Sequence, residues 1–98
     1  MELEAPPVHE LKCWPEYFGP VCDGRKTFEV RRNDRGFHKG DTLLLREWSR
    51  NFDGYSGREC RVKVQGVYSD LPGVHEGFVV MSIMRVQVSA SQPTEETL

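Results

Sequence analysis

Three ionisable side chains of different chemistry lie close together in the stretch DGRKTFEVRRNDRG, residues 23–36. The guanidinium of Arg31 suits bidentate contact with a phosphate or carboxylate, and the ammonium of Lys26 acts as a point charge. The carboxylate of Glu29 stays ionised between them, so it could pair with either cation, act as a base, or accept a hydrogen bond from the exocyclic amine of a nucleobase. Lys26 and Glu29 are therefore the candidate catalytic residues. The alternative is a structural Lys–Glu–Arg network that only orders the chain.

These groups must be positioned by a strand expected over residues 26–32, where Glu29 and Arg31 point the same way, about 7 Å apart. A helix of about two turns is expected just before it, in PEYFGPVCDG, because Pro15 suits a first turn and Gly24 suits a C-terminal cap. Pro20 is expected to kink or shorten this helix. The turn after the helix would then deliver the three charges to one side of the strand.

Other residues near these elements could touch the same ligand. Lys12 and Trp14 precede the helix, where a cation beside an aromatic ring could form a stacking platform for a base, although Trp14 could equally pack on the core. Trp48 is expected to pack on the core or its rim, and Arg46 rather than Glu47 is expected to face the cleft. Arg32, Asn33 and Arg35 lie at a turn and could touch backbone phosphates. The candidate binding residues are Lys12, Trp14, Lys26, Glu29, Arg31, Arg32, Asn33 and Arg46.

The remaining pattern is that of a mostly β, α+β domain. Strands are expected at 8–14, 26–32, 42–48, 60–68 and 78–88, with a bulge at Gly66, and residues 49–59 read as a polar hairpin loop with turns at Asp53-Gly54 and Ser56-Gly57. Five or six strands with so much alternation tend to close or curl, which removes exposed edges. We therefore expect a small β-barrel with one or two short helices against its opening.

Gly24, Lys26, Glu29 and Arg31 form the pattern G-x-K-x-x-E-x-R, and they stand among the segments HELKCWPEYF, GDTLLLREW and GFVVMSI. Over residues 9–83 the chain resembles the ASCH domain, a branch of the PUA-like superfamily of RNA-associated β-barrels, and within it a subgroup of small bacterial and phage proteins. The resemblance implies a cleft between helix and barrel that is lined by the signature and holds RNA, a nucleotide or a modified nucleoside.

The same resemblance leaves an enzyme as the alternative function. Some ASCH relatives are amidohydrolases that remove the acetyl group of N4-acetylcytidine, and ribonuclease activity is attributed to others. The amidohydrolases carry a threonine three residues after the signature lysine, where this chain has Glu29, whereas Thr27 is adjacent to Lys26. A protein-interaction module with a structural polar cleft is the third hypothesis.

Composition limits these hypotheses. The 98 residues suffice for one domain, which we expect at 8–88 between a flexible lead (1–7) and a disordered tail (89–98). The acidic start lacks a signal peptide and no apolar run could span a membrane, so a cytoplasmic protein is expected, with no cofactor and no metal site. Net charge is −2, but residues 25–63 hold eleven Lys/Arg against six Asp/Glu, which suits a local anion-binding face or a mixed charged surface. The three cysteines form no CxxC pair and are expected to be free thiols in a reducing compartment.

Overall fold

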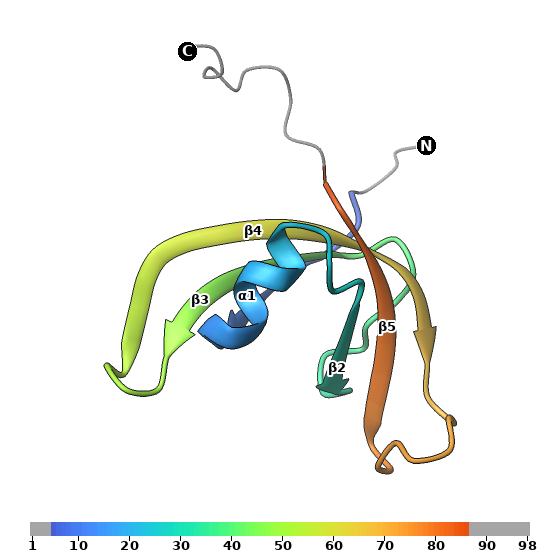
Figure 1. Cartoon of the computed structure of the whole chain (residues 1–98). Helices are drawn as coiled ribbons and strands as arrows, with labels where there is room; N and C mark the ends of the chain where they lie inside the picture. The colour runs from blue at the N-terminus through green and yellow to red at the C-terminus, as the bar shows by residue number, and fades with distance from the viewer. Residues whose placement is uncertain (1–4, 87–98) are drawn as a thin grey trace.

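A five-stranded sheet, curled into a half-barrel, forms the body of the protein (Figure 1). The computed structural model describes residues 5–86. The strands lie in the order β1-β3-β4-β5-β2; β1 and β3 are parallel and the other neighbours are antiparallel. Their bounds are Val8–Cys13 (β1), Phe28–Arg32 (β2), Thr42–Ser49 (β3), Gly54–Tyr68 (β4) and Phe78–Arg85 (β5). The expected mostly β architecture with five strands is confirmed. The observed sheet does not close into a complete barrel, because its edge strands β1 and β2 do not pair with each other.

Alternation along the strands places one apolar face inside the curl. Successive side chains of a strand point to opposite faces, and every second residue of β3, of the second half of β4 and of most of β5 is buried. Within the described residues the one helix, α1 (Pro15–Cys22), packs into the same concavity with Phe18 and Val21. The core consists of Leu11, Cys13, Phe18, Val21, Phe37, Leu43, Leu45, Val62, Val64, Val79, Met81 and Ile83.

Helix α1 has the two turns expected from the sequence, with Pro15 in its first turn. Pro20 lies inside the helix, which ends two residues later at Cys22. Gly24 then adopts φ +88°, a left-handed conformation that costs glycine little. The backbone N–H of Lys26 donates to the carbonyl of Pro20 at 2.9 Å, so the chain folds back over the end of the helix and leads directly into β2.

The hairpin between β3 and β4 differs from the expectation of a polar loop over residues 49–59. β4 begins at Gly54, and Ser56-Gly57 lies within this strand rather than in a turn. The reversal occurs before it, at Asp53 with φ +50°. The first part of β4 is exposed, so no burial pattern marks it as a strand. The expected bulge is confirmed, since the β4–β5 register shifts between Val64 and Gly66.

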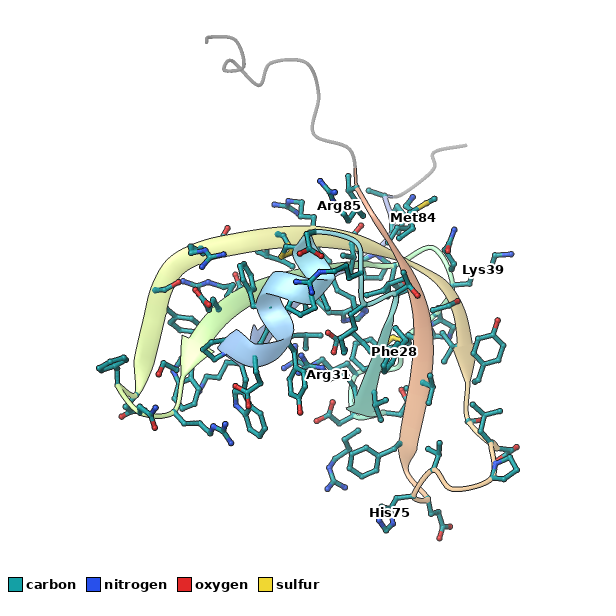
Figure 2. All side chains as sticks on the ribbon, in the orientation of Figure 1. Phe28, Arg31, Lys39, His75, Met84 and Arg85 are labelled. Atoms are coloured by element: carbon teal, nitrogen blue, oxygen red, sulfur yellow. A yellow bond between two sulfur atoms is a disulfide. The ribbon has the colours of Figure 1, made fainter. Side chains whose placement is uncertain are left out.

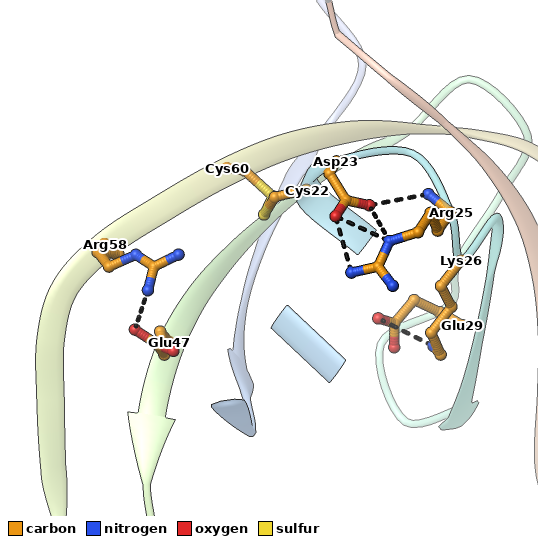
Figure 3. Close-up of a disulfide and its surroundings, with 8 residues drawn as sticks. All are labelled: Cys22, Asp23, Arg25, Lys26, Glu29, Glu47, Arg58 and Cys60. Atoms are coloured by element: carbon orange, nitrogen blue, oxygen red, sulfur yellow. Dashed lines mark hydrogen bonds and ion pairs between the residues drawn. A yellow bond between two sulfur atoms is a disulfide. The ribbon is translucent and has the colours of Figure 1, made fainter. Parts of the chain in front are cut away.

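The prediction that all three cysteines are free is wrong. Cys22 at the end of α1 forms a disulfide with Cys60 of β4, across a sequence separation of 38 residues (Figure 3). Cys13 is a free and buried thiol. The disulfide therefore fastens the helix to the central part of the sheet.

No helix in the span 5–86 is long and apolar enough to cross a membrane. The predicted tail (89–98) and residues 1–4 of the predicted lead lie outside the described residues.

Candidate ligand-binding site at the open seam of the sheet

The two edge strands, β1 and β2, leave a seam in the half-barrel, and α1 stands beside it (Figure 1). A cavity of about 540 Å³ opens there. Its walls come from β1, from α1 with the residue before it, and from the turn and strand that follow. The lining residues are Lys12, Cys13, Trp14, Tyr17, Lys26, Phe28, Glu29, Val30 and Arg31.

The three charged residues of the sequence pattern meet in this cavity. Glu29 is buried, with 4% of its surface exposed. Its Oε1 accepts a hydrogen bond from Nε of Arg31 at 3.1 Å. Its Oε2 lies 3.8 Å from Nζ of Lys26, and Figure 3 shows this pair. Oε2 is buried and has no hydrogen-bond partner. The carboxylate therefore retains an acceptor for a further donor.

Each cation is also anchored to the main chain. Nζ of Lys26 donates to the carbonyl of Phe28 at 2.8 Å and lies 4.4 Å from the centre of the Phe28 ring. Nη2 of Arg31 crosses the seam and donates to the carbonyl of Lys12 in β1 at 2.9 Å. Arg31 lies between α1 and β2 in the view of Figure 2. These bonds hold both cations in place at the cavity wall.

An aromatic pair forms the helix side of the cavity. Trp14, the N-cap of α1, stacks on Tyr17 with ring centres 6.2 Å apart and planes 24° apart. The guanidinium of Arg50, from the β3–β4 hairpin, lies 3.9 Å from the centre of the Trp14 ring. Trp14 is 39% exposed, so it does not belong to the buried core. Lys12 lines the same cavity, and its ammonium lies 4.3 Å from the centre of the Trp48 ring.

Three other predicted binding residues do not line this cavity. Arg32 is exposed and lies over the Phe78 ring, and the side-chain oxygen of Asn33 accepts a hydrogen bond from the backbone of Phe37. Arg46 lies over the Tyr55 ring on the opposite face of β3 from the buried Leu43 and Leu45. Its predicted inward orientation is therefore wrong.

The inward-facing residue at this point of β3 is Glu47, whose exposed fraction is 9%. It follows Leu43 and Leu45 at the spacing of two that a strand imposes, so the alternation itself contained this signal. Ser56 donates to its Oε1 at 2.7 Å and Arg58 pairs with it at 3.5 Å. These partners satisfy the charge, and Glu47 does not line the cavity.

Four lining residues were missed by sequence reasoning as site residues: Cys13, Tyr17, Phe28 and Val30. Their positions in the sequence could have identified them. Cys13 and Tyr17 stand close to Trp14, and Phe28 and Val30 flank Glu29 in the same strand. Burial raises the pKa of the Cys13 thiol from its ordinary 9.0 to about 11, and the nearby Glu29 carboxylate adds to this rise. Cys13 is therefore a neutral, apolar part of the wall at physiological pH.

Within residues 5–86 no three His, Cys, Asp or Glu side chains are grouped so that they could hold a metal ion. The lining residues of the cavity give it the chemistry of a hydrogen-bonding pocket. It combines a buried acceptor, two fixed cations and an aromatic wall.

Comparison with known proteins finds a similar phage protein, a similar solved structure and a matching domain family. It is 35% identical over 74 residues to the uncharacterized 12.9 kDa protein in the GpA 3′ region of Escherichia phage P2, a match that covers 76% of this chain and 65% of the phage protein. Among solved structures it is similar to the hypothetical protein PH0355, with a TM-score of 0.55, 22% identity, and coverage of 81% of this chain and 99% of that one. The latter likeness concerns the fold alone. The model of a domain of unknown function, DUF3850, matches residues 8–83, and the chain therefore belongs to the DUF3850 family.

Proposed function

We propose that this protein is an ASCH/PUA-like domain that binds RNA or a nucleotide and takes the base into the seam cavity. The observation that carries the proposal is Oε2 of Glu29, a buried carboxylate oxygen without a hydrogen-bond donor at the cavity. A buried acceptor without a partner costs free energy that a bound N–H group would recover. The exocyclic amine of a nucleobase supplies such a donor beside a flat, apolar ring.

The wall of the cavity suits a planar ring. The face of a base can stack on an aromatic side chain, as Trp14 already stacks on Tyr17. Such stacking contributes about 1–3 kcal/mol per base by alanine substitution. The cavity volume of about 540 Å³ is within the usual range of small-molecule sites. The signature Gly24, Lys26, Glu29 and Arg31 supports the same ligand class through its resemblance to ASCH domains.

Binding is favoured over hydrolysis by the nucleophiles available. Thr27, the neighbour of Lys26, lines a second cavity and not the one that contains Glu29. The Cys13 thiol is protonated at neutral pH because burial raises its pKa to about 11, and a thiol is a much weaker nucleophile than a thiolate. We therefore retain amidohydrolase and ribonuclease activity only as alternative outcomes of the test.

Long-range attraction to phosphates is expected to contribute less than the cavity. Seven of the eleven cations of residues 25–63 already pair with carboxylates. They are Arg25, Lys26, Arg31, Arg35, Arg46, Arg50 and Arg58. Because few phosphates would be neutralised, we expect the logarithm of the affinity to depend only weakly on the logarithm of salt concentration.

The test is calorimetric titration of the protein with CMP, AMP, GMP, UMP and a short single-stranded RNA. Trp14→Ala should weaken binding about tenfold or more, since it removes the stacking surface. The matched control is Phe52→Ala, which removes an aromatic ring that is 85% exposed in the β3–β4 hairpin and does not line the cavity. Equal affinities of the two variants would contradict the proposal.

The same samples, together with N4-acetylcytidine, should be analysed for products by chromatography. Release of acetate or of shorter RNA would contradict a function of binding alone and would support the hydrolase alternative. If no nucleotide or RNA binds and no product forms, the RNA-binding proposal fails and the interaction module takes its place.

A further inference from the structure

The free edge of β2 presents main-chain hydrogen-bonding groups to the seam. In an antiparallel pair, residues alternate between those that bond to the partner strand and those that bond away from it. The carbonyl of Thr27 accepts from the backbone of Ile83 at 3.0 Å, and the backbone of Asn33 donates to Gly77 at 2.8 Å. Glu29 and Arg31 stand between them in the same register, opposite Met81 and Val79 of β5.

It follows that Phe28, Val30 and Arg32 direct their N–H and C=O groups away from β5. Lys26 bears this out, since its ammonium donates to the carbonyl of Phe28 at the free side. Val30 lines the cavity and is half exposed. Across residues 5–86, no side chain or loop donates to or accepts from the main chain of Val30. Within the described residues its amide N–H therefore has no acceptor, and it belongs to a residue of the cavity wall.

The seam does not leave room for an added strand along β2. Two guanidinium groups bridge its edges: Nη2 of Arg31 donates to the carbonyl of Lys12, and Nη1 of Arg35 donates to the carbonyl of Glu10 at 2.9 Å. An extended peptide that paired with β2 over several residues would have to break both bonds. A compact planar group beside Val30 would break neither.

We infer that the main-chain N–H of Val30 donates to the accepting ring nitrogen on the Watson–Crick edge of adenine or cytosine, whose neighbouring amine donates to Oε2 of Glu29. This inference rests on the proposed function and adds the base class. In both bases the amine lies next to a ring nitrogen that accepts a hydrogen bond. On the same edge uracil and guanine have a carbonyl next to a ring N–H, so their donor and acceptor are reversed. The amine of guanine adjoins that N–H on this edge and not an accepting nitrogen.

The first experiment removes only the N–H. In Val30→Pro the lost donor is not part of the β2–β5 ladder, and proline is tolerated on an edge strand when its nitrogen faces the open side. We expect CMP and AMP to bind about tenfold more weakly to Val30→Pro than to Val30→Ala, which retains the N–H. Arg32→Pro is the matched control, because Arg32 has the same orientation on the same edge but lies outside the cavity. It should bind like the wild type.

The second experiment leaves the protein unchanged. Wild-type protein is titrated with CMP and with 3-deaza-CMP, in which a C–H replaces the accepting ring nitrogen. We expect the analogue to bind about tenfold more weakly. Equal affinity for the two nucleotides overturns the inference, even if Val30→Pro or Arg32→Pro fails to fold.

The outcomes separate this inference from the proposed function. Binding of all four nucleotides with equal affinity, with a loss in Trp14→Ala, would leave the binding function standing and refute the reading by Val30 and Glu29. A preference of at least about tenfold for CMP and AMP over UMP and GMP would support both. No binding of any nucleotide or of the RNA refutes both.

Discussion

At the scale of single residues, burial separates charges that look alike in the sequence. Asp23 and Arg25 form an ion pair with hydrogen bonds that lower the pKa of the Asp23 carboxyl, but both groups are exposed and the pair contributes little to stability. Glu29 is buried between Lys26 and Arg31, where loss of a partner would leave an uncompensated charge. The spacing of three and then two residues predicted their convergence. Their depth depends on the curl of the sheet, which the spacing does not contain.

Cys13 should make stability depend on alkaline pH. Its pKa is raised in the folded protein to about 11 from 9.0, so the unfolded chain releases this proton first. The stabilising contribution is complete below pH 9 and is lost between pH 9 and pH 11. A shift of this size corresponds to an upper limit of about 3 kcal/mol. Urea unfolding at a series of pH values should show this loss.

The control is Cys13→Ala measured over the same range, because other groups also titrate there. The difference between wild type and variant in the free energy of unfolding should be constant up to about pH 9 and should then shrink as the pH rises. A difference that stays constant up to pH 11 would mean that the thiol is not desolvated in the folded state.

At the scale of secondary-structure elements, prediction succeeded where burial alternates and failed where it does not. β3 and the second half of β4 carry every second residue inward, and the sequence located both. The first half of β4 is exposed on both faces, so its polar residues looked like a loop. The charge of Arg46 favoured it for the cleft, but the parity set by Leu43 and Leu45 turns Glu47 inward instead. In this strand, the alternation of side chains between the two faces, and not the type of residue, decides which side chain is buried.

The disulfide between α1 and β4 could not be predicted, because nothing in the spacing of three cysteines identifies a pair separated by 38 residues. It should contribute to stability by restricting the unfolded chain. For a loop of this length the expected contribution is about 4 kcal/mol. Chemical unfolding with and without a reductant should show a corresponding decrease in the free energy of unfolding.

Thiol titration supplies the check on this pairing. Denatured, unreduced protein should react with one equivalent of a thiol reagent through Cys13, and reduced protein with three. Cys22→Ser and Cys60→Ser should each be about as unstable as the reduced wild type, and a reductant should not destabilise them further. Three reactive thiols before reduction would contradict the pairing.

At the scale of the whole molecule, the half-barrel is closed by side chains where a closed barrel would have a strand-to-strand ladder. The composition and the five strands predicted a curled sheet, but not where the curl stops. That place depends on the edge strands β1 and β2 and on the helix that stands at the gap (Figure 1). The carbonyls of Glu10 and Lys12 would otherwise be unpaired at the edge of β1, and Arg35 and Arg31 bind them. The same gap provides the cavity.

Removal of the bridge from Arg35 to Glu10 should therefore destabilise the edge strand β1 locally, while the packing of the hydrophobic core stays unchanged. In Arg35→Ala the carbonyl of Glu10 loses its donor, and we expect hydrogen exchange in β1 to accelerate about five- to tenfold, which corresponds to a net hydrogen bond of about 1 kcal/mol. Arg32→Ala is the control, because this guanidinium lies over the Phe78 ring and does not cross the seam. Exchange in β4, inside the sheet, should be unchanged in both variants. Equal exchange of β1 in the two variants would mean that the parallel ladder with β3 alone holds that edge, and that the arginine bridges do not determine how far the half-barrel opens.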